Sequence, residues 1–136
     1  MDDPALLVVR RCYEAIAARD LGSFVGVLAP ECIMHEAGDG VVPHAGAYRG
    51  KAEIAGVFRR LSELSGGSGR FELQHLFSNS AGQVISIHRN LGSRPDGRSL
   101  DTQEALLFTV EDGLVTSVRN FYDDFDDVAA FWTDGE

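Results

Sequence analysis

The chain has 136 residues, 44% of them hydrophobic and 24% charged, which is the composition of one soluble globular domain and excludes long disordered or repetitive segments. A formal net charge of −9 excludes a broad electrostatic interaction with nucleic acid or an anionic membrane, since both require concentrated Lys and Arg. No run approaches the ~18 apolar residues of a transmembrane helix, and the acidic start is unlike a signal peptide. We expect a single domain over residues 1–136, in the cytoplasm, with Cys12 and Cys32 as buried free thiols.

Helical signals open the chain. Asp3 before Pro4 is typical of a helix N-terminus, and apolar residues then recur at helical spacing through Arg19. Asp20 predicts the cap of a second, short helix over residues 21–28. The chain therefore begins with two consecutive helices.

A strand, a loop and a third helix are predicted next. Pro30 ends the second helix, and residues 32–36 form a short, partly apolar run that favours a strand. Residues 37–50 are rich in Gly and Pro, so we expect a long loop without regular structure. Apolar residues at helical spacing predict a helix over 51–64.

From residue 70 onward the apolar period changes from about 3.6 to about 2, which is typical of strands. Turn signals separate four predicted strands, over residues 70–78, 83–93, 99–110 and 114–122, and a helical turn follows over 128–132. Helices segregated from a run of hairpins indicate the α+β class. We expect a curved antiparallel sheet, closed into a cone by three N-terminal and mid-chain helices, with an internal pocket for a small ligand.

The turns between strands predict which side chains meet. If residues 111–113 form a three-residue loop, Asn120 lies opposite Glu104. If residues 95–97 form a similar loop, His88 also lies opposite Glu104. The three side chains would then be neighbours on one face of the sheet.

A His, a carboxylate and an amide at the end of an apolar stripe suit a catalytic or ligand-orienting pocket. Glu104 in such a place would have a raised pKa and could exchange a proton near neutral pH. His88 could share that proton, and Asn120 could orient an oxyanion or water. The alternatives are a surface polar patch or a satisfied buried network.

Further candidates for the pocket come from the same pattern. They are Tyr13, His35, Tyr48, Asn90, Leu106, Val118 and Tyr122. His35 could instead pair with Glu36 to fix the loop, and Tyr13 or Tyr48 could be core or packing residues. No His or Cys spacing typical of a metal site is present, so we expect neither metal nor cofactor.

Three segments resemble the SnoaL-like branch of the nuclear-transport-factor-2-like superfamily, which includes ketosteroid isomerases, limonene epoxide hydrolases and polyketide cyclases. They are Ile33-Met34-His35-Glu36 with the following loop and Ala47-Tyr48-Arg49-Gly50-Lys51, then residues 107–115, and finally Val118-Arg119-Asn120-Phe121-Tyr122-Asp123 with the tail that ends Phe131-Trp132. The resemblance implies a cone-shaped α+β fold, a deep apolar pocket and a homodimer formed through the sheet. It also implies that Asn120 stands where the cyclases and epoxide hydrolases have an acid/base Asp, and that Glu104 matches the polar position on the adjacent strand.

Three functions remain open at this point. The first is a cofactor-free enzyme of isomerase, cyclase or epoxide-hydrolase type acting on a small apolar metabolite, with Glu104 as acid/base, His88 as its partner and Asn120 as an orienting donor. The second is a non-catalytic module that binds such a ligand. The third is a structural dimer whose pocket is filled by its own side chains.

Overall fold

The computed structural model describes residues 3–133 as four helices and one six-stranded sheet. The helices are α1 (Pro4–Ala17), α2 (Leu21–Gly26), α3 (Gly50–Leu64) and α4 (Phe125–Trp132). The strands are β1 (Leu28–Glu36), β2 (Gly46–Arg49), β3 (Arg70–Ser78), β4 (Gln83–Ser93), β5 (Ser99–Glu111) and β6 (Leu114–Tyr122). The predicted α+β class is confirmed.

The helix N-termini form for the reason that the sequence indicates. The Asp3 carboxylate accepts a hydrogen bond of 2.9 Å from the Ala5 N–H, and Pro4 occupies the first helical position, where its missing N–H costs nothing. Asp20 caps α2 in the same way by accepting from the Ser23 N–H at 3.0 Å. Both predicted caps are confirmed.

The sheet has the strand order β2-β1-β6-β5-β4-β3. Strands β3 to β6 form the predicted antiparallel meander, whereas β1 runs parallel to β6. The sheet is therefore mixed, and the expectation of a purely antiparallel sheet is wrong at this one pairing. The parallel pairing arises because β1 returns to the sheet beside the last strand, which no local turn signal can indicate.

Two predicted boundaries also need correction. Segment 37–50 is not loop throughout, because residues 46–49 form edge strand β2 and pair with β1. Pro30 does not end a helix but lies inside β1, next to an irregularity between Leu28 and Ile33 in the pairing with β6. Proline is tolerated there because an irregular pairing does not need its missing N–H.

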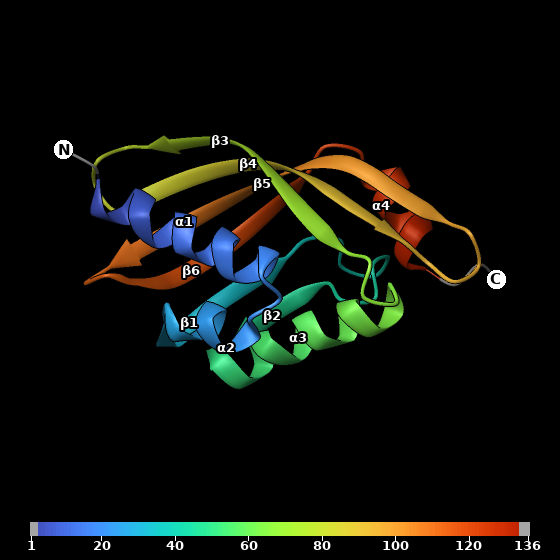
Figure 1. Ribbon diagram of the computed structural model, residues 1–136, viewed down its shortest axis with the longest axis horizontal. Coiled ribbons are helices and arrows are strands. Elements are labelled where there is room, and N and C mark those ends of the chain that lie inside the picture. Colours follow the sequence, from blue (N-terminus) through green and yellow to red (C-terminus); the bar gives the residue numbers. More distant parts are fainter. Residues whose placement is uncertain (1–2, 134–136) are drawn as a thin grey trace.

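Helices α1, α2 and α3 all lie on one side of the sheet, and α4 lies at its far end beside the β4–β5 hairpin (Figure 1). Buried residues of α1, α3 and the sheet form the main core, including Val9, Ile54 and Val84. A second cluster around Phe131 and Trp132 of α4 closes the far end. The result is the predicted cone, with one concave face covered by helices.

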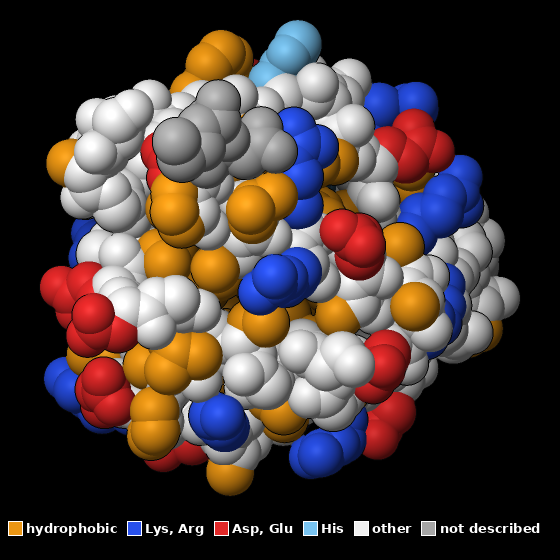
Figure 2. Space-filling view, turned by 60° about the vertical axis from the view of Figure 1, so that its left-hand side comes forward, with side chains coloured by type: hydrophobic (Ala, Val, Ile, Leu, Met, Phe, Trp, Pro, Cys, Tyr) orange, Lys and Arg blue, Asp and Glu red, His pale blue; other side chains and the backbone are white. Residues whose placement is uncertain are grey.

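The surface carries charges of both signs. Figure 2 shows acidic, basic and hydrophobic side chains interspersed on the side of the molecule that lies at the left of Figure 1. Among residues 3–133, no helix is both long enough and apolar enough to cross a membrane.

Candidate functional site

A cavity of about 450 Å³ lies between the concave face of the sheet and helices α1 to α3. Its wall is mostly apolar, with Phe24, Met34, Phe58, Leu61, Phe108 and Val118 among its residues. At its deep end it reaches polar side chains, of which Glu36 and Glu104 are the two carboxylates. A cavity of this size and polarity is suited to a small molecule with an apolar body and few polar groups.

Side chains of Glu104, His88 and Asn120 meet beside this cavity. His88 Nε2 lies 2.8 Å from Glu104 Oε1, and the Asn120 amide donates to Glu104 Oε2 at 2.9 Å. His88 is 0%, Asn120 3% and Glu104 6% exposed, which excludes a surface polar patch. Both oxygens of Glu104 therefore have strong partners in a buried setting.

The three side chains meet as predicted, but the register between β5 and β6 differs from the predicted register. His88 pairs with Glu104 as expected, but Asn120 pairs with Leu106, two residues away. The loop between β5 and β6 has two residues, Asp112 and Gly113, both with positive φ, as a type I′ turn requires. Compared with the predicted three-residue loop, this turn shifts the pairing of β6 with β5 by one residue. A β-bulge between Thr109 and Val110 shifts the pairing by one residue more.

The two shifts add to an even number, so Asn120 keeps the predicted face. Its amide reaches Glu104 diagonally rather than directly across the strand pair. In the same register Val118 pairs with Phe108, and Tyr122 pairs with Glu104.

Tyr13 of α1 extends the network from His88. Its hydroxyl oxygen lies 2.5 Å from His88 Nδ1 and 2.7 Å from the Ser86 hydroxyl. The His88 ring also stacks on Phe71, with 4.1 Å between ring centroids. The imidazole is thus fixed at both nitrogens and on one face, and burial raises the pKa of Tyr13, so the phenol stays protonated.

Glu36, at the end of β1, is the second carboxylate of the site. Its Oε2 accepts from the Asn120 amide at 2.7 Å and, at a longer 3.4 Å, from the Tyr122 hydroxyl. Asn120 therefore bridges Glu36 and Glu104. Burial, and then the nearby charge of Glu104, raise the pKa of Glu36 well above its ordinary range. The residue is half-buried and lines the cavity.

His44 and the residues around it close this part of the cavity. His44 Nε2 lies 3.3 Å from the Tyr122 hydroxyl, and its ring packs edge-on against Trp132 with centroids 5.3 Å apart. Burial lowers the pKa of His44 to about 4, so the ring is neutral at physiological pH. Tyr48 donates to the His44 carbonyl oxygen at 2.8 Å and thereby holds this loop against the sheet.

Most of the predicted pocket residues line the cavity. Six of them line the cavity: Tyr13, Asn90, Glu104, Leu106, Val118 and Tyr122. His88 and Asn120 lie behind the wall and act through Glu104 and Glu36. Tyr48 packs against the core and does not reach the cavity.

The expectation for His35 is wrong. Its neighbours Met34 and Glu36 line the cavity, and side chains alternate along a strand, so His35 points to the opposite face of the sheet. The cavity carboxyl group that sequence reasoning missed is Glu36. The signal was present, because the buried Met34 sets the parity of β1 and assigns Glu36 to the concave face.

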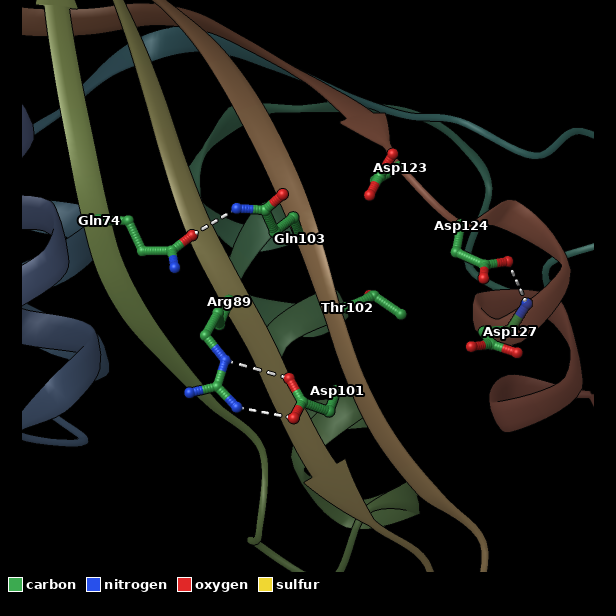
Figure 3. A pocket seen from close by; sticks show the side chains of 8 residues that line it. All are labelled: Gln74, Arg89, Asp101, Thr102, Gln103, Asp123, Asp124 and Asp127. Carbon is green, nitrogen blue, oxygen red and sulfur yellow. Dashed lines mark hydrogen bonds and ion pairs between the residues drawn. The ribbon is translucent and has the colours of Figure 1, made fainter.

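A second hollow lies on the outside of the molecule, between the convex face of the sheet and the start of α4 (Figure 3). Its polar groups are largely paired with one another: Arg89 binds both oxygens of Asp101, and Gln103 donates to Gln74 at 2.8 Å. Within residues 3–133, no group of three or more His, Cys, Asp or Glu side chains could hold a metal ion. The internal cavity is therefore the stronger candidate site.

Comparison with protein families finds a match over residues 9–118 to the SnoaL-like domain. A curated relative, the uncharacterized protein Rv0034 of Mycobacterium tuberculosis, is 33% identical over 131 residues, which are 96% of this chain and 98% of the relative.

Two solved structures are similar over almost the whole chain. Bal32a, from a soil-derived mobile gene cassette, is 28% identical with a TM-score of 0.90, and the match covers 96% of this chain and 97% of that one. RV0760c from Mycobacterium tuberculosis, crystallised in complex with estradiol-17beta-hemisuccinate, is 15% identical with a TM-score of 0.75 and covers 90% and 95%. The second likeness concerns the fold alone.

Proposed function

The chain belongs to the SnoaL-like domain family, and on this premise we propose that its cavity binds a small, largely apolar metabolite and that Glu36 exchanges a proton with it. The reaction would be cofactor-free and of isomerase, cyclase or hydrolase type. The cavity supports the binding part, and the neighbouring carboxyl groups of the buried Glu104 and the half-buried Glu36 support the proton transfer.

The proposal depends on which carboxyl group carries the proton. Two carboxylates that share one buried site do not both ionise easily, because their charges repel at low dielectric. Glu104 is the better anion, since His88 and Asn120 both bind it at 2.9 Å or less. Glu36 is then the protonated partner, in agreement with the raised direction of its pKa.

The hydrogen bonds around Glu104 allow one consistent assignment of donors and acceptors. If Glu104 is ionised, His88 donates from Nε2 and accepts at Nδ1 from the Tyr13 hydroxyl, which in turn accepts from Ser86. Asn120 donates one amide hydrogen to each glutamate, and its own oxygen accepts from the Ala37 N–H at 2.7 Å. The network therefore holds Glu104 as an anion without any unpaired member.

The observation that carries the proposal is the free oxygen of Glu36. Its Oε2 is bound by Asn120 and Tyr122, whereas among residues 3–133 nothing forms a hydrogen bond with Oε1. Because the side chain lines the cavity, Oε1 is the oxygen available to a bound molecule. A protonated Glu36 would give its proton to a carbonyl, ether or epoxide oxygen and, as a carboxylate, take a proton back.

Ligand binding is the first test. Wild-type protein is expected to be stabilised in a thermal-shift screen by steroids, terpenoid epoxides or aromatic polyketides, by about 2.7 kcal/mol at 100 times the dissociation constant. Leu106→Trp, which fills the cavity, is expected to remove that shift. The matched control is Leu7→Trp on the exposed side of α1, which is expected to keep it. A shift that survives in Leu106→Trp would contradict binding in the cavity.

A non-catalytic binding module is the second candidate. One observation favours it: the amide of Asn120, which cannot act as a base, occupies the centre of the network between both carboxylates. Incubation of a ligand from the screen distinguishes the two functions. Conversion by wild type but not by Glu36→Gln supports the enzyme, and recovery of unchanged ligand from both supports the binding module.

We also propose that the chain forms a homodimer through the convex face of its sheet. Three of the most exposed large hydrophobic side chains, Phe77, Ile85 and Phe121, lie on this face, which α1 to α3 do not cover. Such a group of apolar side chains is typical of an interaction surface, and packing two sheets face to face would bury it.

Light scattering after size-exclusion chromatography tests the dimer. Wild type is expected to have twice the mass of the 14.7 kDa chain, and Phe121→Arg the mass of a monomer, because an arginine at the centre of an apolar interface is not paired. Val41→Arg, which changes an equally exposed apolar side chain in the loop before β2, is the control and is expected to stay dimeric. A monomeric wild type would refute the dimer.

A further inference from the structure

The mouth of the cavity carries three arginines. Arg19 follows the end of α1, Arg59 lies on α3 and Arg70 begins β3, and all three side chains are exposed while lining the cavity. The acidic residues that also line it are Asp20 and Glu63 beside them, with Glu36 and Glu104 at the deep end. At the mouth, three arginines stand against the two acidic residues Asp20 and Glu63, which leaves one excess positive charge there in a chain whose net charge is −9.

The acidic neighbours do not neutralise these arginines directly. The carboxylate of Asp20 is bound to the N-terminus of α2, where it accepts from the Ser23 N–H at 3.0 Å and from the Ser23 hydroxyl at 2.6 Å. Within residues 3–133, neither Arg19 nor Arg59 has an ion-pair partner, and the ion pair of Arg70 with Glu72 is a long 3.8 Å between exposed groups. The guanidinium groups are therefore available to a bound molecule.

Arg19 occupies a backbone position that normally suits glycine. Its φ of 57° is left-handed, and the Asp20 N–H closes the end of α1 by donating to the Ala15 carbonyl oxygen at 2.9 Å. Glycine is preferred at this position because a side chain is strained there. The end of α1 therefore fixes the backbone from which the Arg19 side chain reaches the rim of the cavity.

We infer that the ligand of this cavity carries an anionic group, such as a carboxylate or sulfonate, at the end that reaches the mouth. Its apolar body would fill the cavity, and its anionic end would lie among Arg19, Arg59 and Arg70. This inference rests on the proposed binding function and narrows the ligand class to acidic amphipathic molecules. Guanidinium groups bind such oxyanions in bidentate fashion.

A pair of fluorescent probes that differ only in charge tests the inference. N-phenyl-1-naphthylamine is neutral, and 1-anilinonaphthalene-8-sulfonate has the same aromatic body with a sulfonate. Wild-type protein is expected to bind the sulfonate more tightly, and the preference is expected to shrink between low and high salt because exposed charges are screened. Leu106→Trp is expected to abolish binding of both probes.

Arginine substitutions then locate the effect. Arg59→Gln is expected to weaken binding of the sulfonate about two- to fivefold, the triple variant with Arg19→Gln and Arg70→Gln to weaken it further, and neither to change binding of the neutral probe. Arg11→Gln, an exposed arginine of α1 outside the cavity, is the matched control and is expected to have no effect.

Each other outcome has a distinct meaning. Equal affinity of wild type for the two probes overturns the anionic-group inference, and so does sulfonate binding that persists in Leu106→Trp. In both cases the proposed binding function still stands if the neutral probe binds in the cavity. Loss of both probes to the same extent in the triple variant overturns it as well. Failure of wild type to bind either probe overturns the inference together with the apolar-cavity function.

Discussion

His88→Ala is expected to lower the free energy of unfolding by about 3–5 kcal/mol. The substitution removes the buried donor to Glu104 Oε1, the ring that stacks on Phe71, and the partner of the Tyr13 hydroxyl. Most of the loss comes from leaving the Glu104 charge buried with Asn120 as its remaining partner, because an uncompensated buried charge costs far more than a lost exposed contact. Urea denaturation followed by circular dichroism measures the change.

Two further variants identify the cause of that loss. Arg10→Ala removes an exposed side chain from α1 and is expected to change stability by less than about 0.5 kcal/mol. Adding Glu104→Gln to His88→Ala removes the buried charge. The double variant is therefore expected to lose less stability than the two single variants lose in sum. A loss below about 1 kcal/mol in His88→Ala would show that Glu104 is not held as an anion by His88.

Glu36→Gln is expected to make the protein more stable than wild type at neutral pH, by a margin that grows with pH. The folded pKa of Glu36 is raised, so between its ordinary value of 4.5 and the folded value the unfolded chain releases a proton that the folded protein keeps. In wild type, the contribution of protonated Glu36 to stability is complete below pH 4.5. It declines as pH rises from there through the folded pKa, by about 1.4 kcal/mol per pH unit. Glutamine imitates the protonated acid and cannot ionise, so its contribution does not decline.

The measurement is the difference in unfolding free energy between wild type and Glu36→Gln from pH 4.5 to pH 8. The difference is needed because His44 has a pH dependence of the opposite sign. Its folded pKa of about 4 lies below its ordinary value of 6.5. The contribution of His44 to the stability of the folded protein is therefore lost as pH falls from 6.5 to about 4. Both proteins contain His44, and its effect cancels. Glu31→Gln, an exposed change on the same strand, is the control. A difference that stays constant with pH would refute a protonated Glu36.

Much of the fold could be predicted because its signals are local. Strands β3, β4 and β6 have the predicted bounds, since period-two alternation and the Gly-containing turns between them are written in short stretches of sequence. Helix α3 begins one residue before the predicted start. Edge strand β2 was not predictable in the same way, because its four residues include Gly46 and gain their structure from pairing with β1.

The candidate site could be predicted as far as the sequence shows which side chains of a strand share one face of the sheet. His88, Glu104 and Asn120 share the concave face because the two-residue turn and the β-bulge displace β6 by two residues in total. Had only one of these features been present, Asn120 would lie on the convex face. His35 was assigned to the pocket without a prediction of strand parity, and the parity of β1 places its neighbour Glu36 on the concave face instead.

By itself the sequence determined the α+β class, the meander, the helix caps and the pairing of His88 with Glu104. These follow from periodicity, turn residues and capping residues, each of which acts over a few positions. Only the tertiary structure decided that β1 runs beside β6, since that contact joins residues more than 80 positions apart. That one pairing brings Glu36 to Asn120 and so turns a single buried carboxylate into a coupled pair. Pairwise repulsion and desolvation depend on distance in space, and for this reason the raised pKa of Glu36 is a property of the folded chain alone.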